Sequence, residues 1–221
     1  MERKIIITED GSHSIAIPEW NVIYHSIHGA IQESKHIFIE AGLNYILNNS
    51  PKKLSILEMG LGTGLNVLLT AIESEGHDVE IHYTAIEQFP ISVDEAKSLN
   101  YAEVLHYDDL FEKIHDSEWA KDILLSEHFI IRKENIDLVN YLINNQFDLV
   151  YYDAFAPAAQ PELWTKDIFQ KLFFLLKPNG VLVTYCSKGD VRRAMMAAGF
   201  LVKKLPGPQG KREILRAEKI N

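Results

Sequence analysis

The 221-residue chain has few of the features that mark several large classes of protein. It contains one cysteine, Cys186, which excludes an intramolecular disulfide framework and is typical of a reducing compartment. No apolar run approaches the length of a membrane span. The first residues, MERKIIITEDG, hold too short an apolar run for a signal peptide. We therefore expect a cytoplasmic protein that does not enter a membrane.

Positive charge is also scarce. The chain has 22 Lys and Arg residues against 31 Asp and Glu residues, which gives a formal net charge of −9. This balance argues against a protein that coats nucleic acids non-specifically, because such binding depends on neutralising phosphates. A local basic surface stays possible, so the positions of the cations matter more than their sum.

Two common nucleotide-binding motifs are absent from the most glycine-rich stretch. Residues 54–66, LSILEMGLGTGLN, read as an apolar strand that ends in Glu58, then Gly60, Gly62 and Gly64, then an apolar helix. The spacing E-x-G-x-G-x-G is neither the dinucleotide fingerprint nor a P-loop. Glycines permit a sharp turn and a close approach of ligand to backbone, and the N–H groups that open the helix point toward such a ligand. The alternative is a purely structural glycine turn.

Acids end the strands that follow. Residues 79–87 predict a parallel strand ending in Glu87, where doubly wound folds place the carboxylate that binds ribose hydroxyls. Capping of a helix at 91–99 is a compatible role. After the next strand, 128–131, Glu134 is placed to reach an adenine amino group, with Asn135 as the second candidate. An exposed loop acid is the alternative for Glu134.

A second strong signal lies at residues 147–153, FDLVYYD, an apolar strand that ends in Asp153. Because ligands of open α/β sheets bind at the carboxyl ends of strands, Asp153 should face the same crevice as the glycine turn. Pro157 restricts the following loop, and Phe155 and Trp164 offer flat faces for a planar substrate. These residue types predict an active site, and a proline-rich helix entrance is the alternative.

The whole pattern predicts an α/β fold. Residues 1–50 form an N-terminal extension with a hairpin (4–7 and 14–17) and a crossing helix. Residues 51–221 form a seven-stranded, mostly parallel sheet with an antiparallel edge strand.

Three further expectations complete this outline. The acidic stretch 101–126 predicts short helices and loops, and residues 138–144 predict a helix. The histidines of the extension, His25, His28 and His36, have neither a cysteine pair nor a His-Glu-x-x-His motif beside them, so we expect no metal site.

Basic residues gather near the end of the chain, from residue 188 onward. They are Lys188, Arg192, Arg193, Lys203, Lys204, Lys211, Arg212 and Arg216. The cluster predicts a phosphate-binding surface on an otherwise acidic protein. Solvated charges at a sheet edge are the alternative.

Several segments together resemble one family. The stretches EMGLGTGLN, YYDAFAPAAQPELWT, YCSKGDVRRAMMAAGF and GPQGKREIL resemble the methyltransferase domain of the bifunctional tRNA wobble-uridine modification protein MnmC and its standalone form, MnmD. YHSIHGAIQESKHIFIEAGL resembles the substrate-side N-terminal part of that family. The resemblance covers residues 20–217. It implies a Rossmann-like class I methyltransferase fold and S-adenosylmethionine as the cofactor.

The resemblance also implies a reaction and partners. The enzyme would methylate the amine of 5-aminomethyl(-2-thio)uridine at the tRNA wobble position, giving 5-methylaminomethyl(-2-thio)uridine. It would contact the anticodon region of tRNA, and we expect a monomer. Bifunctional members carry a C-terminal FAD-dependent oxidase. Because this chain ends at Asn221, we expect no FAD and a functional partnership with a separate oxidase.

Roles can be assigned on this basis. Asp153 would be the catalytic group that attracts the ammonium, accepts its proton or orients the free amine. The predicted cofactor-binding residues are Glu58, Gly60, Gly62, Gly64, Glu87, Glu134 and Asn135. The predicted substrate-binding residues are Tyr24, His25, Phe155, Pro157, Trp164, Lys188, Arg192, Arg193, Lys211 and Arg212.

Two other hypotheses compete with this one. A methyl- or aminopropyltransferase acting on a small-molecule amine would need no RNA, and its basic cluster would be incidental. A non-catalytic binding module is the other, and the intact glycines with Glu87 and Asp153 argue against it.

Overall fold

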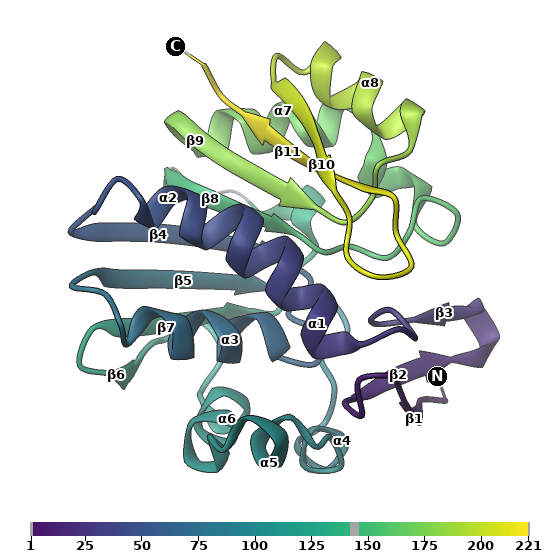
Figure 1. The fold of residues 1–221 in the computed structure, drawn as a ribbon, viewed down its shortest axis with the longest axis vertical. Coiled ribbons are helices and arrows are strands. Elements are labelled where there is room, and N and C mark those ends of the chain that lie inside the picture. Colours follow the sequence, from purple (N-terminus) through teal and green to yellow (C-terminus); the bar gives the residue numbers. More distant parts are fainter. Residues whose placement is uncertain (1, 142–145, 221) are drawn as a thin grey trace.

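The computed structural model describes residues 2–141 and 146–220, which contain two β-sheets (Figure 1). The large sheet has the strand order β10-β11-β9-β8-β4-β5-β7-β6. Its strands are β4 (Lys53–Met59), β5 (Glu80–Ile86), β6 (Asp122–Ser126), β7 (Phe129–Glu134), β8 (Phe147–Tyr152), β9 (Leu176–Thr184), β10 (Leu201–Pro206) and β11 (Glu213–Glu218).

The order and pairing confirm the α/β prediction. Strands β9, β8, β4, β5 and β7 pair in parallel, while β11 runs antiparallel to β9 and β10 antiparallel to β11. The predicted strand count needs correction, because the described residues add an eighth strand, β6, antiparallel to β7. β6 lies inside the acidic stretch in which only helices and loops were expected. Only Leu125 of its five residues is buried, so its sequence shows no clear strand pattern.

Helices cover both faces of the large sheet. The helices are α1 (Ala30–Ser34), η2 (Lys35–Leu43), α2 (Asn44–Leu47), α3 (Leu65–Ser74), α4 (Val93–Lys97), α5 (Tyr101–Leu105), α6 (Asp108–Asp116), α7 (Lys166–Leu175) and α8 (Gly189–Ala197), with 3-10 turns η1 (Pro18–Trp20), η3 (Leu138–Asn140) and η4 (Pro161–Trp164). The π-helical stretch η2 joins α1 to α2, so these three form the crossing helix. They lie with α3 on one face, and α7 and α8 lie on the other (Figure 1).

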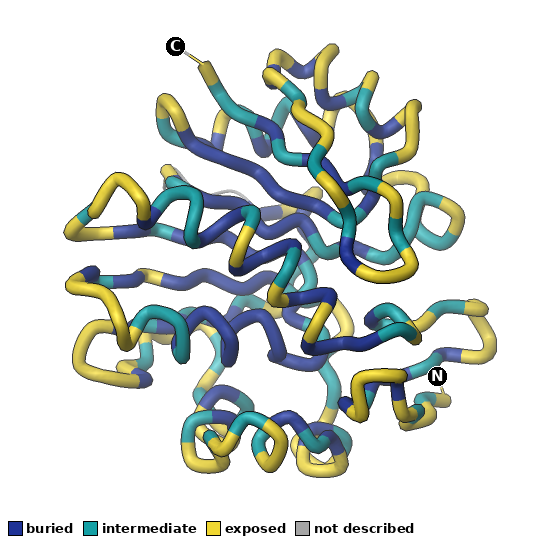
Figure 2. The backbone as a smooth tube through the Cα atoms, in the orientation of Figure 1, coloured by how far each residue is buried: buried dark blue, intermediate teal, exposed yellow. Residues whose placement is uncertain are grey.

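Of the helix expected at 138–144, the structure describes the short 3-10 turn η3 and then Tyr141, whose backbone is extended, and residues 142–144 of that prediction lie outside the described residues. Two buried clusters, one on each face of the sheet, form the core. Figure 2 shows the central strands buried along most of their length, with exposed backbone at the sheet's margins and along α4, α5 and α6. In the described part of the chain, no helix combines the length and apolar character that a membrane span requires.

The small sheet holds the predicted hairpin and one more short strand. β1 (Lys4–Ile7) and β2 (His13–Ile17) are antiparallel, and β3 (Val22–Ile23) pairs with β2. This sheet lies at the end of the large sheet where its parallel strands terminate, on the right of Figure 1. It therefore stands beside the glycine turn and Asp153. The domain division at residue 50 remains a prediction.

Candidate active site

The glycine turn that follows β4 has a backbone that other residues rarely adopt. Gly60, Gly62 and Gly64 have φ angles of +93°, +51° and +75°. A Cβ atom on Gly60 would lie 2.8 Å from the carbonyl oxygen of Asp153, and one on Gly62 would lie 3.1 Å from the Tyr24 ring. The missing side chains thus permit both the turn and the close approach of two other segments.

A cavity opens against this turn, which we call the glycine-loop cavity. Its walls are residues 59–63 with Leu65 and Asn66, residues 86–89 after β5, residues 153–155 after β8 with Gln160, and Trp20, Tyr24 and His25. Gly60 and Gly62 belong to this wall, whereas Gly64 begins α3 beside His115.

A second cavity, the Lys211 cavity, lies on the other side of Asp153. Its walls are residues 21–26, Glu33, residues 153–156, Tyr185 and Lys211. The residues common to both cavities are Tyr24, His25, Asp153, Ala154 and Phe155. Asp153 therefore stands at a shared wall, where it can reach one ligand in each cavity.

Burial, and after it the charge of the nearby Glu33, raise the pKa of the Asp153 carboxyl to about 7. A hydrogen bond from Asn66 and the charge of Lys211 act in the opposite direction. The group therefore changes its protonation state near neutral pH, which suits a proton acceptor. The backbone N–H of Asp153 donates to Met59 O at 3.0 Å, which fixes the loop against the end of β4.

Asn66, which sequence reasoning missed, connects two acids. Its Nδ2 donates to Glu58 Oε1 at 2.9 Å and to Asp153 Oδ2 at 3.0 Å. Glu58 itself is fully buried and lies outside both cavity walls, and burial raises its pKa well above the usual value. The structure thus places Glu58 behind Asn66, where it orients Asn66, rather than against a ligand. The position of Asn66 in the first turn after the glycines was the available signal.

Glu87 lies on the cavity wall, as expected. Its carboxylate accepts from Gly62 N–H at 3.0 Å and from Phe89 N–H at 2.8 Å, so it joins the glycine turn to the loop after β5. Each carboxylate oxygen keeps acceptor capacity for a ligand hydroxyl.

Glu134 and Asn135 lie outside the cavity wall. Glu134 pairs with Arg132 Nε at 2.5 Å, and Asn135 Nδ2 donates to the carbonyl oxygens of Glu87 and Gln88 at 2.8 and 3.2 Å. The side chains that form the wall at this place are Gln88 and Phe89. Asn135 therefore acts on the cavity through the backbone of the loop, and the adenine contacts of both residues remain predictions.

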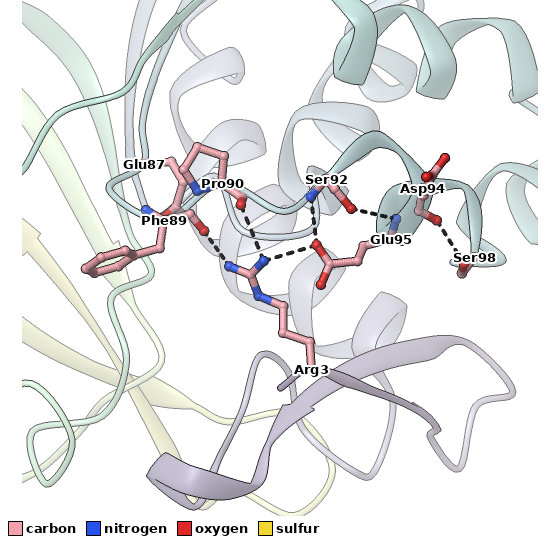
Figure 3. Close-up of polar contacts among 8 residues, drawn as sticks. All are labelled: Arg3, Glu87, Phe89, Pro90, Ser92, Asp94, Glu95 and Ser98. Atoms are coloured by element: carbon pink, nitrogen blue, oxygen red, sulfur yellow. Dashed lines mark hydrogen bonds and ion pairs between the residues drawn. The ribbon is translucent and has the colours of Figure 1, made fainter. Parts of the chain in front are cut away.

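The loop after β5 is also held from the N-terminal sheet (Figure 3). Arg3, just before β1, donates from Nη2 to Phe89 O at 2.7 Å and from Nη1 to Pro90 O at 3.4 Å. The same Nη1 pairs with Glu95 Oε2 at 3.0 Å, and Glu95 in turn forms a capping box with Ser92. We call these contacts the Arg3 clasp. Nothing in the local sequence around Arg3 signals this contact.

Aromatic rings line the junction of the cavities. Tyr24 and Phe155 meet edge to face at a centroid distance of 5.0 Å, and Trp20 contacts both Phe89 and Phe155. Trp164 differs from prediction, because it is buried against Tyr152 and donates from Nε1 to Phe155 O at 2.8 Å. It supports the loop and lines neither cavity.

Two more predicted substrate contacts, Pro157 and His25, lie in different places relative to the cavities. Pro157 lines neither cavity. His25 lines both, and its Nε2 shares a hydrogen bond of 2.8 Å with Thr63 Oγ1. Burial lowers the His25 pKa to about 4, so this ring is neutral near neutral pH. Within residues 2–141 and 146–220, no group of three His, Cys, Asp or Glu side chains is arranged to hold a metal ion.

The basic cluster divides into two groups. Lys203 and Lys204 pair with Glu218 and Glu213 at 2.9 and 2.7 Å, Lys211 pairs with Glu33, and Arg216 pairs with Glu218 at 3.6 Å. Across the described residues, no ion pair involves the remaining predicted phosphate contacts, which are Lys188, Arg192, Arg193 and Arg212. Of these four, only Arg192 is partly buried.

The fold, the glycine turn and the two strand-end acids define a class of protein. Residues 94–220 match the model of a family described as S-adenosyl-L-methionine-dependent methyltransferase, and the chain belongs to that family. A bifunctional tRNA 5-methylaminomethyl-2-thiouridine biosynthesis protein, MnmC, of Pseudomonas fluorescens is 31% identical over 210 residues, which cover 89% of this chain and 32% of that protein. MnmC of Leptospira interrogans is 30% identical over 214 residues, with coverages of 89% and 32%. The chain thus spans about a third of the length of these relatives.

Solved structures agree on the fold. The crystal structure of MNMC2 from Aquifex aeolicus superposes with a TM-score of 0.79 at 25% identity, covering 98% of this chain and 70% of that one. Spermidine synthase from Thermotoga maritima follows with a TM-score of 0.65 at 16% identity, covering 98% and 69%. The second likeness concerns the fold alone.

The glycine-loop cavity suits the family's cofactor. Its glycine turn leaves room that a Cβ atom would fill, and Glu87 lies at the end of the strand that neighbours β4, where ribose hydroxyls bind in this type of fold. Residues 60–63 and Glu87 are the groups that would hold S-adenosylmethionine.

Proposed function

We propose that this protein transfers a methyl group from S-adenosylmethionine to the amine of 5-aminomethyl(-2-thio)uridine at the wobble position of tRNA. The position of Asp153 on the wall between the two cavities carries the proposal. The glycine-loop cavity would hold the methyl donor, and the Lys211 cavity would hold the modified base. The similarity to the MnmC proteins supports this choice of substrate.

Bound S-adenosylmethionine supplies an electrophilic methyl group: the amine lone pair forms the new N–C bond while the C–S bond breaks and its electron pair stays on sulfur. An ammonium has no lone pair, so a protein group must first take its proton. Asp153 can do this, because its pKa of about 7 lets it bind and release protons near neutral pH. Asn66 holds the carboxylate in place. Most of the acceleration would come from aligning amine and methyl across the shared wall.

The remaining roles follow from position. Tyr24 and Phe155 present ring edges and faces beside Asp153 and would hold the uracil. Lys188, Arg192, Arg193 and Arg212 would contact phosphates of the anticodon region. An FAD-dependent oxidase would prepare the amine from a carboxymethyl precursor.

The substitution Asp153→Asn tests the central role. We expect methyl transfer to fall by about 100-fold or more, because the amide cannot accept the proton. Donor binding should stay within a few-fold of that of the unmodified protein, because the amide keeps the size of the carboxylate. Radiolabelled methyl transfer to tRNA and calorimetric binding of S-adenosylmethionine give the two readouts, with the exposed Asp94→Asn as the matched control.

The tRNA should come from cells able and unable to make the aminomethyl-uridine precursor. Label only in the precursor-bearing tRNA is the expected result. If neither tRNA is labelled while the donor binds, a small-molecule amine becomes the better substrate class. If Asp153→Asn weakens donor binding as much as transfer, Asp153 belongs to the donor site instead.

A further inference from the structure

The Lys211 cavity contains a buried ion pair that the proposed reaction has not yet used. Glu33 of α1 is 7% exposed, and its Oε1 pairs with Lys211 Nζ. Its Oε2 accepts from the backbone N–H of Ser26 at 2.6 Å. Lys211 lies in the loop between β10 and β11, and its Nζ stands 4.2 Å from the centre of the Tyr185 ring. Three segments far apart in the sequence thus fix one acid and one cation beside Asp153.

This arrangement is poorly suited to phosphate binding. The Lys211 side chain is 29% exposed and is held by Glu33 and the Tyr185 ring, whereas a phosphate contact needs a cation that faces solvent. The neighbouring Arg212 is exposed and better placed for that role. Lys211 instead faces the space in which the acceptor amine would bind.

We infer that Glu33 and Lys211 are positioning residues of the acceptor site, which set the local charge so that Asp153 is the group that takes the amine's proton. The inference rests on the proposed function. Because Lys211 neutralises Glu33, Asp153 is the carboxylate that can accept a proton from the incoming ammonium. The fixed cation also disfavours a second positive charge nearby, so it favours the neutral amine that methyl transfer needs.

Among the charged and titratable groups near Asp153, this pair has the main influence on its pKa, in addition to burial. His25 is neutral near neutral pH, Tyr185 has a strongly raised pKa, and Tyr24 also has a raised pKa, so these carry no charge. Glu58 has a raised pKa behind Asn66, and Glu87 is bound to backbone N–H groups across the glycine-loop cavity. The Coulombic influences on Asp153 are those of Glu33, which raises its pKa, and Lys211, which lowers it.

Two substitutions therefore have opposite expected effects. Lys211→Met keeps an apolar side chain over Tyr185 and leaves the charge of Glu33 without a partner. The pKa of Asp153 should then rise, so the acidic limb of the pH profile of kcat/KM should move to higher pH. Glu33→Gln keeps an acceptor for Ser26 and removes the negative charge, so the limb should move to lower pH. Each shift should be on the order of half a pH unit. The double variant should return the limb close to its original position.

Because every assay uses the same tRNA amine, a change in the limb belongs to the protein. Lys204→Met removes an equivalent cation from the same hairpin, outside both cavities, and should leave the limb unchanged. Shifts in the same direction, or no shift with activity simply lost, would overturn the inference. If Lys211→Met raises the KM for tRNA and leaves the acidic limb of the pH profile where it was, Lys211 would act in phosphate binding instead.

A titration without substrate separates this inference from the proposed function. Carbon-13 labelling of aspartate carboxyls, with the Asp153 signal assigned from Asp153→Asn, reports the Asp153 pKa directly. Opposite shifts in the two variants are expected here too, and equal titration curves would refute the inference. If the unmodified protein labels no tRNA, the proposed function fails by itself, whatever this titration gives.

Discussion

Asp153, the proposed catalytic residue, illustrates how a buried carboxyl can lower the stability of the folded protein. A carboxyl that titrates at about 7 in the folded protein, against an ordinary value of 3.8, binds its proton more tightly when folded. Between those two values the folded state holds more protons than the unfolded state. The free energy of unfolding therefore falls as the pH rises through this window.

Removing the negative charge of Asp153 should restore the free energy of unfolding that is lost as the pH rises. We expect Asp153→Asn to be more stable than the unmodified protein above about pH 8, by on the order of 2 kcal/mol, and to lose this advantage below about pH 4. Urea unfolding at several pH values measures the difference, and the exposed Asp94→Asn gives the baseline. An advantage that grows toward acid would contradict the assigned sign.

Some site residues could be predicted from sequence and others could not. Gly60, Gly62 and Asp153 were predictable, because a turn with positive φ and a strand end are local properties. Arg3 and Glu33 were not, because their partners lie 92 and 178 positions away in the chain. Glu134 had the expected place at a strand end, but its neighbour Arg132 binds it. Pairing between side chains leaves no mark in the local pattern.

Among the structural elements, the loop after β5 depends most on a distant segment. Its backbone carbonyl groups are bound by the Arg3 clasp on one side and by Asn135 on the other (Figure 3). The loop also supplies Gln88 and Phe89 to the glycine-loop cavity. The small N-terminal sheet thus helps to shape a cavity built mainly by the large sheet.

Removing the contacts of the Arg3 clasp should weaken the binding of S-adenosylmethionine. We expect Arg3→Met to raise the Kd for S-adenosylmethionine about tenfold, because the wall then has to be ordered on binding. The kcat at saturating donor should change much less. Lys4→Met removes a neighbouring exposed cation that, within the described residues, pairs with Glu2, and calorimetry should show no effect of it. Equal weakening in both variants would point to net charge instead of the clasp.

Elements with strong local patterns were predicted well. Strands β4, β5 and β8 are apolar runs that end in an acid or a turn, and their order follows from the fold class. β6 was missed because it is a short edge strand inside an acidic stretch, and only one of its five residues is buried. Its pairing with β7 exists only once β7 is in place.

For the whole molecule, a net charge of −9 means that the proposed tRNA substrate would have to bind at a confined basic surface. Among the described residues of the cluster, the cations outside any ion pair are Lys188, Arg192, Arg193 and Arg212, because the others pair with acids. The basic cluster was predictable from sequence, whereas its division into cations with and without an acidic partner required the structure.

Replacing Arg192 and Arg193 by Gln should raise the KM for tRNA several-fold. It should also lower the slope of log KM against log salt by about one for each phosphate that the variant no longer neutralises. The matched control is Lys203→Gln with Lys204→Gln, which removes as many charges from cations held by Glu218 and Glu213. If the control pair has the larger effect, the surface that binds tRNA would lie on the terminal hairpin, β10 and β11, instead.

The close approach of Gly60 to Asp153 also bears on how the chain folds. The two residues adjoin because β8 inserts beside β4, although β5, β6 and β7 separate them in the sequence. No partly folded chain that lacks β8 contains the site. A ligand in the glycine-loop cavity touches both segments, so its binding free energy adds to the stability of the complete sheet and to no intermediate short of it.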